Sequence, residues 1–317
     1  MAKSIKELKE IKTLVTHNGV MHGDDVIATA FLMCAGGIIG HNFKVERVNS
    51  SLAKKYVNDP TCLVFDVGNG PYDHHDKNNM KFRKVMDPTT KEFTVDGIPY
   101  AAIGLLWNDF GESYLSEIYR ARTGATNEEL VKKYFKIFDS RYISTIDGRD
   151  NATPGIKSNI SDTISCMNQQ GNGPGANFDN AVFWAQTAFV AWTNSIISDM
   201  ISSHELDQAI SVLDEDETIL SLSHFISFNG IHEKCPSIRY VIYPSARDPG
   251  CWCAQTVSHN GELLYPFNPS KSLYKDMVFI HASGFMATAK SREAIIAACD
   301  RNDELIKRRK EESSNAE

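Results

Sequence analysis

The order of secondary structure in the first 66 residues most constrains what this chain can fold into. A short apolar run at 13–16 predicts a buried strand, and runs at 43–48 and 61–65 predict two more. After the first run, apolar residues recur at helical spacing from Asp24 until a glycine pair at 36–37, which we expect to end the helix. This order favours an α/β fold with a mainly parallel sheet.

Polar side chains follow two of these predicted strands at the point where each strand ends. His17 follows the first strand and Asp66 follows the third. Open α/β sheets bind ligands outside the carboxyl ends of their strands. We therefore expect both side chains along one edge of the sheet.

The rest of the chain predicts helices first and strands again later. Residues 100–203 have a mostly helical pattern, interrupted by a Gly-, Pro- and Asn-rich loop at 169–177. A charged helix is expected from Ser291 onward. Short, partly alternating runs between them predict strands at 238–243, 252–257 and 277–281.

An acidic and polar stretch near residues 204–218 predicts a boundary between two domains. A chain of 317 residues is long enough for two domains of about 150 residues each. We expect a larger domain over 1–205 and a smaller α/β domain over 206–317.

Composition excludes some classes of protein. The 33 basic and 40 acidic residues give a net charge of −7, which excludes a globally basic nucleic-acid coat protein but not a local basic groove. The longest nearly apolar stretch, 30–39, is about half as long as a membrane span. The first residues lack the pattern of a secretory signal, and the seven cysteines show no repeated spacing. We expect a cytoplasmic protein without disulfides or membrane attachment.

A concentration of His and Asp residues predicts a metal site. Five of the ten histidines fall within 59 residues, and four of these, His17, His22, His74 and His75, lie near a predicted strand end with aspartates close by in the sequence. Imidazole and carboxylate suit Mn²⁺, Fe²⁺, Co²⁺ or Zn²⁺, and six or more such ligands exceed what one tetrahedral zinc uses. Two metals sharing a carboxylate would activate water and neutralise charge on a phosphoryl group. The candidate residues are His17, His22, Asp24, Asp66, Asp73, His74, His75 and Asp147.

Three segments carry a specific resemblance to a known family. The sequences THNGVMHGDD at 16–25, FDVGNGPYDHHD at 65–76 and AAIGLLW at 101–107 resemble the DHH phosphoesterase superfamily. Within it they resemble the melanocyte-proliferating-gene (Myg) family, also catalogued as metal-dependent protein hydrolases. The resemblance covers about residues 13–298. Further matches are IDGRDN at 146–151, WCAQTV at 252–257 and HASGF at 281–285.

The resemblance implies a pair of divalent metals, of manganese type, and cleavage of phosphoesters. Some members are described as 3′–5′ exonucleases acting on RNA. It implies that His75 faces the substrate phosphate, while Asp73 orients a neighbouring histidine. It also implies that Asp66 bridges the metals, whose other ligands would be His17, His22, Asp24, His74 and Asp147. No nucleophile elbow or H-E-x-x-H helix supports hydrolysis of proteins.

The chain departs from the family pattern at several positions. Lys77 stands where the family has Arg soon after the DHH, and Gly23 stands where it has Cys. In the second domain, His281, Lys290 and Arg292 are expected to supply positive charge for substrate phosphate. The remaining departures are Cys253 and Ala254 within the Trp-Arg-Val-Gln motif, and Ala287 and Thr288 at a glycine pair. The metal residues are thus retained, while the substrate-binding part is altered.

The residue patterns predict a metal-dependent phosphoesterase that uses metal-activated water, and the family resemblance implies a 3′–5′ exonuclease acting on short RNA or DNA. Two rivals stay open. One is a pyrophosphatase or cyclic-dinucleotide phosphodiesterase, because the same metal core serves each reaction. The other is a non-catalytic regulator that binds metal or nucleotide. The sequence leaves the oligomeric state open, a homodimer included.

Overall fold

The structure, a computed structural model, describes residues 3–75, 80–86, 93–169 and 175–314. Two compact units make up the chain, Met1–Met200 and Ile201–Glu317. The division falls within the long helix α7 (Phe178–Ile210). In the described part of the chain, no helix is both long and apolar enough to cross a membrane.

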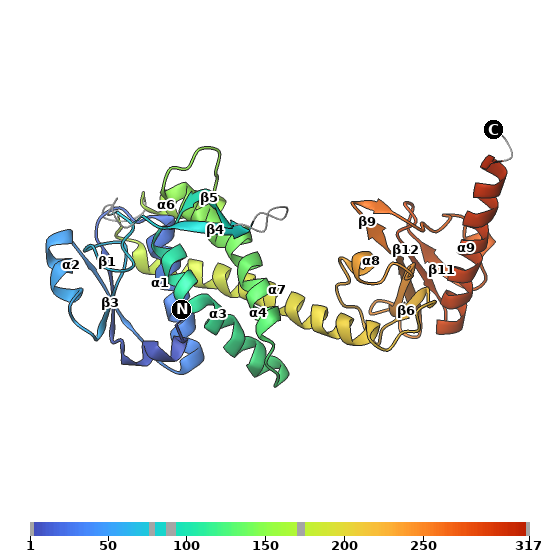
Figure 1. Cartoon of the computed structure of the whole chain (residues 1–317), viewed down its shortest axis with the longest axis horizontal. Coiled ribbons are helices and arrows are strands. Elements are labelled where there is room, and N and C mark those ends of the chain that lie inside the picture. The colour runs from blue at the N-terminus through green and yellow to red at the C-terminus, as the bar shows by residue number, and fades with distance from the viewer. Residues whose placement is uncertain (1–2, 76–79, 87–92, 170–174, 315–317) are drawn as a thin grey trace. The chain divides into compact units, whose positions relative to one another are not determined.

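A three-stranded parallel sheet with strand order β2-β1-β3 begins the first unit. The chain runs from the central strand to one edge and then crosses to the other edge. Because parallel crossovers are right-handed, these opposite directions put α1 and α2 on opposite faces of the sheet (Figure 1). The elements are the 3₁₀ helix η1 (Ile5–Glu10), β1 (Thr13–His17), α1 (Gly23–Ile39), β2 (Lys44–Val48), α2 (Ser50–Tyr56) and β3 (Cys62–Val64).

Helix α1 continues past the glycine pair at which we expected it to end. It ends instead at Gly40, which has φ of 68° and caps the helix in the left-handed conformation. Gly36 serves packing, because a Cβ there would lie 2.6 Å from both the His41 carbonyl oxygen and the Phe43 ring. The position needs glycine for close approach, so the prediction of a stop there is wrong.

The remainder of the first unit is one hairpin and a group of helices. Four fully buried rings form much of its core, with contacting centroids 4.3–6.1 Å apart: Phe31, Trp107, Phe138 and Phe189. The elements are β4 (Phe82–Met86), β5 (Phe93–Pro99), α3 (Ala102–Thr123), α4 (Glu128–Phe138), the π-helix η3 (Asp139–Ile143), α5 (Ser144–Asp150) and α6 (Asn159–Met167).

The second unit is a five-stranded sheet with helices, in the order β11-β12-β8-β7-β6. Only β6 and β7 pair in parallel; the other pairs of this sheet are antiparallel. Its elements are β6 (Ile219–Ser221), α8 (Ile231–Lys234), β7 (Tyr240–Pro244), β8 (Trp252–Thr256), β9 (Ser258–His259), β10 (Glu262–Leu263), η4 (Lys271–Leu273), β11 (Met277–Ile280), β12 (Met286–Ala289) and α9 (Arg292–Ser314). The predicted α/β class is confirmed, with a parallel sheet first and a smaller α/β unit second.

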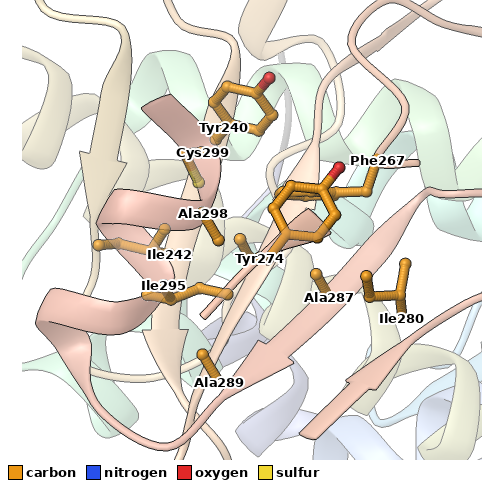
Figure 2. Close-up of a cluster of buried hydrophobic side chains, with 11 residues drawn as sticks. Tyr240, Ile242, Phe267, Tyr274, Ile280, Ala287, Ala289, Ile295, Ala298 and Cys299 are labelled. Atoms are coloured by element: carbon orange, nitrogen blue, oxygen red, sulfur yellow. The ribbon is translucent and has the colours of Figure 1, made fainter. Parts of the chain in front are cut away.

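One core cluster of the second unit lies between this sheet and α9. Figure 2 shows Ile295, Ala298 and Cys299 of α9 next to Tyr240 and Ile242 of β7. All five side chains are buried. Burial of this apolar face fixes the charged C-terminal helix against the sheet.

A single buried amide links several segments around this core. Asn302 of α9 is 1% exposed. Its Nδ2 donates to the Tyr240 hydroxyl at 3.0 Å and to the carbonyls of Tyr265 and Pro266 at 3.2 and 3.3 Å. Its Oδ1 accepts from the Tyr274 hydroxyl at 2.8 Å. The amide therefore ties α9 to β7 and to the segment that follows β10.

We predict that Asn302→Asp lowers the free energy of unfolding by about 2 kcal/mol or more. A carboxylate cannot donate to the carbonyls of Tyr265 and Pro266, so these oxygens would face a buried charge. Urea unfolding measures the loss. Asp300→Asn makes the reverse exchange at an exposed position of the same helix and should stay within about 0.5 kcal/mol of wild type. Equal effects of the two changes would contradict this role of Asn302.

Candidate metal centre

The carboxyl edge of the parallel sheet brings two predicted residues together. His17 is the last residue of β1, and Asp66 lies just beyond β3. The two side chains meet with His17 Nε2 3.1 Å from Asp66 Oδ2. Asp66 is 2% exposed and has φ of 57°, a left-handed conformation that is uncommon for a residue other than glycine. A turn in this rare conformation holds the carboxylate at the sheet edge, away from solvent.

The DHH segment supplies a second histidine to the same carboxylate. His74 Nε2 lies 3.2 Å from Asp66 Oδ1, whereas His17 faces Oδ2. Each oxygen of Asp66 therefore faces a different imidazole. This arrangement suits a carboxylate that is shared by two cations.

The other two residues of the DHH tripeptide form a pair of their own. His75 Nδ1 lies 2.9 Å from Asp73 Oδ1, and the Asn69 backbone N–H donates to Asp73 Oδ2 at 2.7 Å. Asp73 is buried, while His75 is exposed. The hydrogen bond to Asp73 raises the pKa of His75, although burial works against it. Asp73 thus orients His75 and favours its protonated form.

Two helices complete the group around His74. Asp24, in the first turn of α1, places Oδ2 3.6 Å from His74 Nε2, and Asp150, at the end of α5, places Oδ2 3.2 Å from the same nitrogen. Asp150 Oδ1 also lies 3.9 Å from His22 Nδ1. The ring centroids of His22 and His17 are 5.2 Å apart. Four separate segments therefore converge on one site.

The ligand atoms of this site are suited to cations because many of them are buried without hydrogen bonds. In the part of the chain that the structure describes, these atoms include His17 Nε2, Asp24 Oδ1, Asp25 Oδ2, both oxygens of Asp66 and His74 Nε2. Three groups bring ligand atoms within 4.8 Å of one another: His17, His22 and Asp66; Asp66, His74 and His75; and His22, Asp24 and Asp150. Asp66 belongs to two of them. Buried polar atoms without partners are costly, and a bound metal would satisfy them.

Protonation balances the buried carboxylates in the absence of metal. Burial would raise the pKa of Asp66, but contact with His17 and His74 lowers it to about 2. Burial would lower the pKa of His17 and His74, but the adjoining carboxylates raise these values to about 9 and about 10. For Asp24, burial and the neighbouring carboxylates both raise the pKa well above its ordinary value. A bound cation would replace the protons in this balance.

Asp147, a predicted ligand, is engaged elsewhere. Its carboxylate contacts the Arg83 guanidinium and accepts the Gly104 N–H at 3.1 Å, while Arg83 also binds Asp139 through Nε at 2.7 Å. Burial raises the pKa of Asp147 to about 7. The structure brings Asp150 to the histidines instead, three residues later in the IDGRDN motif. Sequence reasoning did not select Asp150, although its place in that motif was a usable signal.

Asp25 is a second residue that the sequence reasoning did not select. Its Oδ1 accepts the His22 backbone N–H at 2.8 Å, and its Oδ2 lies 3.3 Å from His17 Nε2. The Arg47 guanidinium is 3.7 Å from the same oxygen. Asp25 therefore closes the first turn of α1 and lies against a predicted ligand. Its position next to Asp24 was the available signal.

Gly23, where the family has Cys, lies in tight contact with helix α6. A Cβ at this position would be 2.3 Å from Ser161 Oγ and 2.7 Å from Ser161 Cβ. No side chain fits there without movement of Ser161. Glycine at position 23, next to His22 and Asp24, therefore allows the close approach of α6.

The predicted substrate residues of the second unit do not form one cluster. His281 follows β11, and its N–H donates to the Met286 carbonyl at the turn of the β11–β12 hairpin. Lys290 follows β12, and its N–H donates to the Asp276 carbonyl at the open end. The strand between them puts their backbones about 13 Å apart. Arg292 lies near Lys290 and has its guanidinium 5.7 Å from the Trp252 ring centroid. Lys77, predicted for the first unit, lies outside the described residues.

In the second unit, the residues that depart from the family pattern pair with each other across the neighbouring strands β12 and β8. Ala287 pairs with Ala254, and Thr288 pairs with Cys253, between β12 and β8. All four side chains are buried, and Cys253 Sγ lies 3.5 Å from Thr288 Oγ1. These departures therefore fill the interior of the sheet and do not present side chains to a ligand.

A family comparison agrees with the site. The family model MYG1_exonuc, described as an uncharacterised protein family (UPF0160), matches residues 13–265. The chain belongs to the MYG1_exonuc family. This confirms the resemblance found in the DHH and neighbouring motifs. As a MYG1_exonuc protein, the chain is a metal-dependent hydrolase of the phosphoesterase and nuclease class.

Comparisons with individual proteins add little to this membership. None of the curated proteins searched matches the MYG1_exonuc chain. The exonuclease RecJ bound to manganese has 11% identity over 95% of this chain and 94% of its own, with a TM-score of 0.26. RecJ from Thermus thermophilus in complex with Mg²⁺ has 12% identity over 96% of this chain and 51% of its own, with a TM-score of 0.25. TM-scores this low do not establish a shared fold.

The raised histidine pKa values predict that metal binding releases protons. At pH 7, His17 and His74 hold protons that a metal must displace, and Asp24, whose pKa is also raised, adds to them, so Mn²⁺ should release at least about two protons per chain. Calorimetric titration in buffers of different ionisation enthalpy gives this number. His41→Gln is the control, because His41 bonds the Ile11 carbonyl at 2.6 Å and should not alter the release. A binding enthalpy that is independent of the buffer would contradict the prediction.

The same pKa values fix the sign of a stability effect. Protonated His17 and His74 stabilise the metal-free protein fully below about pH 6.5, their ordinary pKa. This contribution is lost as the pH rises through about 9 and about 10, so the melting temperature of the metal-free protein should fall over this range. Metal-loaded protein should show a smaller fall.

Proposed function

We propose that this chain is a 3′–5′ exonuclease that hydrolyses short RNA or DNA with metal-activated water. The observation that carries the proposal is the buried carboxylate of Asp66, because each of its oxygens faces a different histidine. Membership of a family with an exonuclease name supports a nucleic-acid substrate. Water as the nucleophile agrees with a site built from imidazole and carboxylate groups.

Two divalent ions, Mn²⁺ in this proposal, are the cofactors. Mixed imidazole and carboxylate donors suit Mn²⁺. When bound, such ions lower the pKa of a water molecule and neutralise charge that builds on a phosphoryl group. Asp150 takes the place that the sequence prediction gave to Asp147, because Asp147 is bound by Arg83. The proposed ligands are His17, His22, Asp24, Asp66, His74 and Asp150.

The chain's own groups hold and orient the phosphate. His75 lines a cavity of about 450 Å³ beside the proposed ligands. Because Nδ1 is bonded to Asp73, the proton on Nε2 is free to be donated to a phosphate oxygen or a leaving oxygen. Asp73 fixes the ring and favours its charged form. We propose His75 and Asp73 as this catalytic pair.

Residues outside the centre would bind the rest of the substrate. We retain Lys77 and the second-domain residues His281, Lys290 and Arg292 as proposed phosphate contacts, with domains over 1–205 and 206–317. Lys290 and Arg292 lie at the junction of β12 and α9, so they would act together, and His281 would act separately. We also propose a cytoplasmic location, supported by seven cysteines that are all free.

The dinuclear proposal predicts two ions per chain and a dominant effect of Asp66. Asp66→Ala should lose metal and reduce kcat by at least about a hundredfold. The reason is that it removes the carboxylate shared by the His17–His22 group and the His74–His75 group of candidate ligands. Elemental analysis after Mn²⁺ loading and a nuclease assay measure the two effects. Asp162→Ala, at an exposed position of α6, is the control and should keep both ions. One ion or fewer per wild-type chain at saturating Mn²⁺ would overturn the dinuclear centre.

Polarity is tested with end-labelled strands. Wild type with Mn²⁺ should release the 3′-terminal nucleotide first from a short 3′-labelled RNA or DNA, while 5′ label should stay in a ladder of shortening products. Immediate release of a 5′-terminal nucleotide would refute the polarity and leave the nuclease assignment intact. Turnover of pyrophosphate or a cyclic dinucleotide alone would refute the nucleic-acid substrate.

A further inference from the structure

A cavity beside the candidate metal centre extends onto an element that the proposed mechanism does not use. Its volume is about 450 Å³, within the range of pockets that hold one small molecule. Part of the lining consists of His17, His22, Asp66 and His75. The rest includes Ser50 and Lys54 of α2 and the turn formed by residues 67–69. Helix α2 therefore contributes directly to the space next to the predicted metal ligands.

Lys54 gives this cavity a positive charge of its own. It is the only lysine or arginine among the described residues that line the cavity. Among the ion pairs within the described ranges, none involves Lys54, whereas Lys44 on the preceding strand binds Glu46 at 2.6 Å. The Lys54 ammonium group is therefore available to a ligand. Lys55, the next residue of the same helix, does not line the cavity.

Packing fixes the helix that carries Lys54. Ala53 is fully buried in a cluster with Val15, Val48, Val64 and Val67. Gly68 has φ of 88°, and a Cβ there would lie 3.1 Å from both Ala53 Cβ and Val57 Cγ2. This close approach holds the turn after β3 directly against α2. Lys54 thus has a defined backbone position relative to Asp66, which begins the same turn.

We infer that Lys54 binds a phosphate group of a nucleotide held in this cavity. This inference rests on the proposed function and extends it to a residue of α2. An ammonium group without a carboxylate partner, beside a centre suited to divalent cations, selects an anionic ligand. Phosphate is the anion of the proposed substrate, and the volume suits one nucleotide of a single strand. Lys54 is a binding residue in this scheme and holds no metal.

Kinetics of matched variants test the inference. Lys54→Ala should raise KM for a short RNA or DNA about tenfold or more, with two Mn²⁺ ions still bound. Lys54→Arg should restore most of the affinity, because it restores the charge. Lys55→Ala removes the same charge one residue away and should stay within about twofold of wild type. The slope of log affinity against log salt should fall by about 0.7 for Lys54→Ala alone.

A binding measurement separates this inference from the proposed function. The probe is a fluorescent phosphorothioate hexanucleotide, which keeps the backbone charge and resists hydrolysis, mixed with Mn²⁺-loaded protein. Weaker binding by Lys54→Ala than by Lys55→Ala supports the inference even if wild type shows no turnover. Equal binding by the two variants, or no binding by wild type, overturns it. Normal turnover by wild type in that case would leave the proposed function standing.

Discussion

The first unit depends on one buried carboxylate. Asp66 lies beyond the last residue of β3 with both oxygens buried, and neither accepts a hydrogen bond from the residues that the structure describes. Burial alone would raise the pKa of this group, but His17 and His74 lower it to about 2. The sheet order supplies this geometry, because β1 and β3 are parallel neighbours and end at the same edge. The fold therefore places two imidazoles against one buried carboxylate.

Sequence reasoning could find the parts of this site that follow from strand order. The sequence predicts that His17 and Asp66 lie at the same sheet edge, because each follows an apolar run, and the DHH tripeptide indicates His74. Sequence reasoning selected Asp147 as a ligand and not Asp150, which lies in the same short helix. Arg83, which lies 64 residues before Asp147, binds the Asp147 carboxylate across the fold. Such long-range competition leaves no local pattern in the sequence.

The second unit shows a different limit. The strands at Tyr240–Pro244 and Trp252–Thr256 were expected within a few residues, because their apolar runs are short and alternate. The sequence does not predict the short strand Met286–Ala289, because its residues are small and follow a turn. That strand separates His281 from Lys290. His281 and Lys290, only nine residues apart in the sequence, therefore lie at opposite ends of one hairpin. The strand that separates them has too weak a sequence pattern to be predicted.

Several residues that depart from the family pattern lie in close contact with specific neighbours. Gly23 is matched to Ser161, and Cys253 is matched to Thr288 across two strands. A Cys at position 23 would collide with α6 unless residue 161 changed with it. Changes at residues in contact are not additive, so the effect on folding of a substitution at 23 or 253 depends on the residue at 161 or 288. A score that treats each position independently would therefore misjudge the cost of a substitution at either member of such a pair.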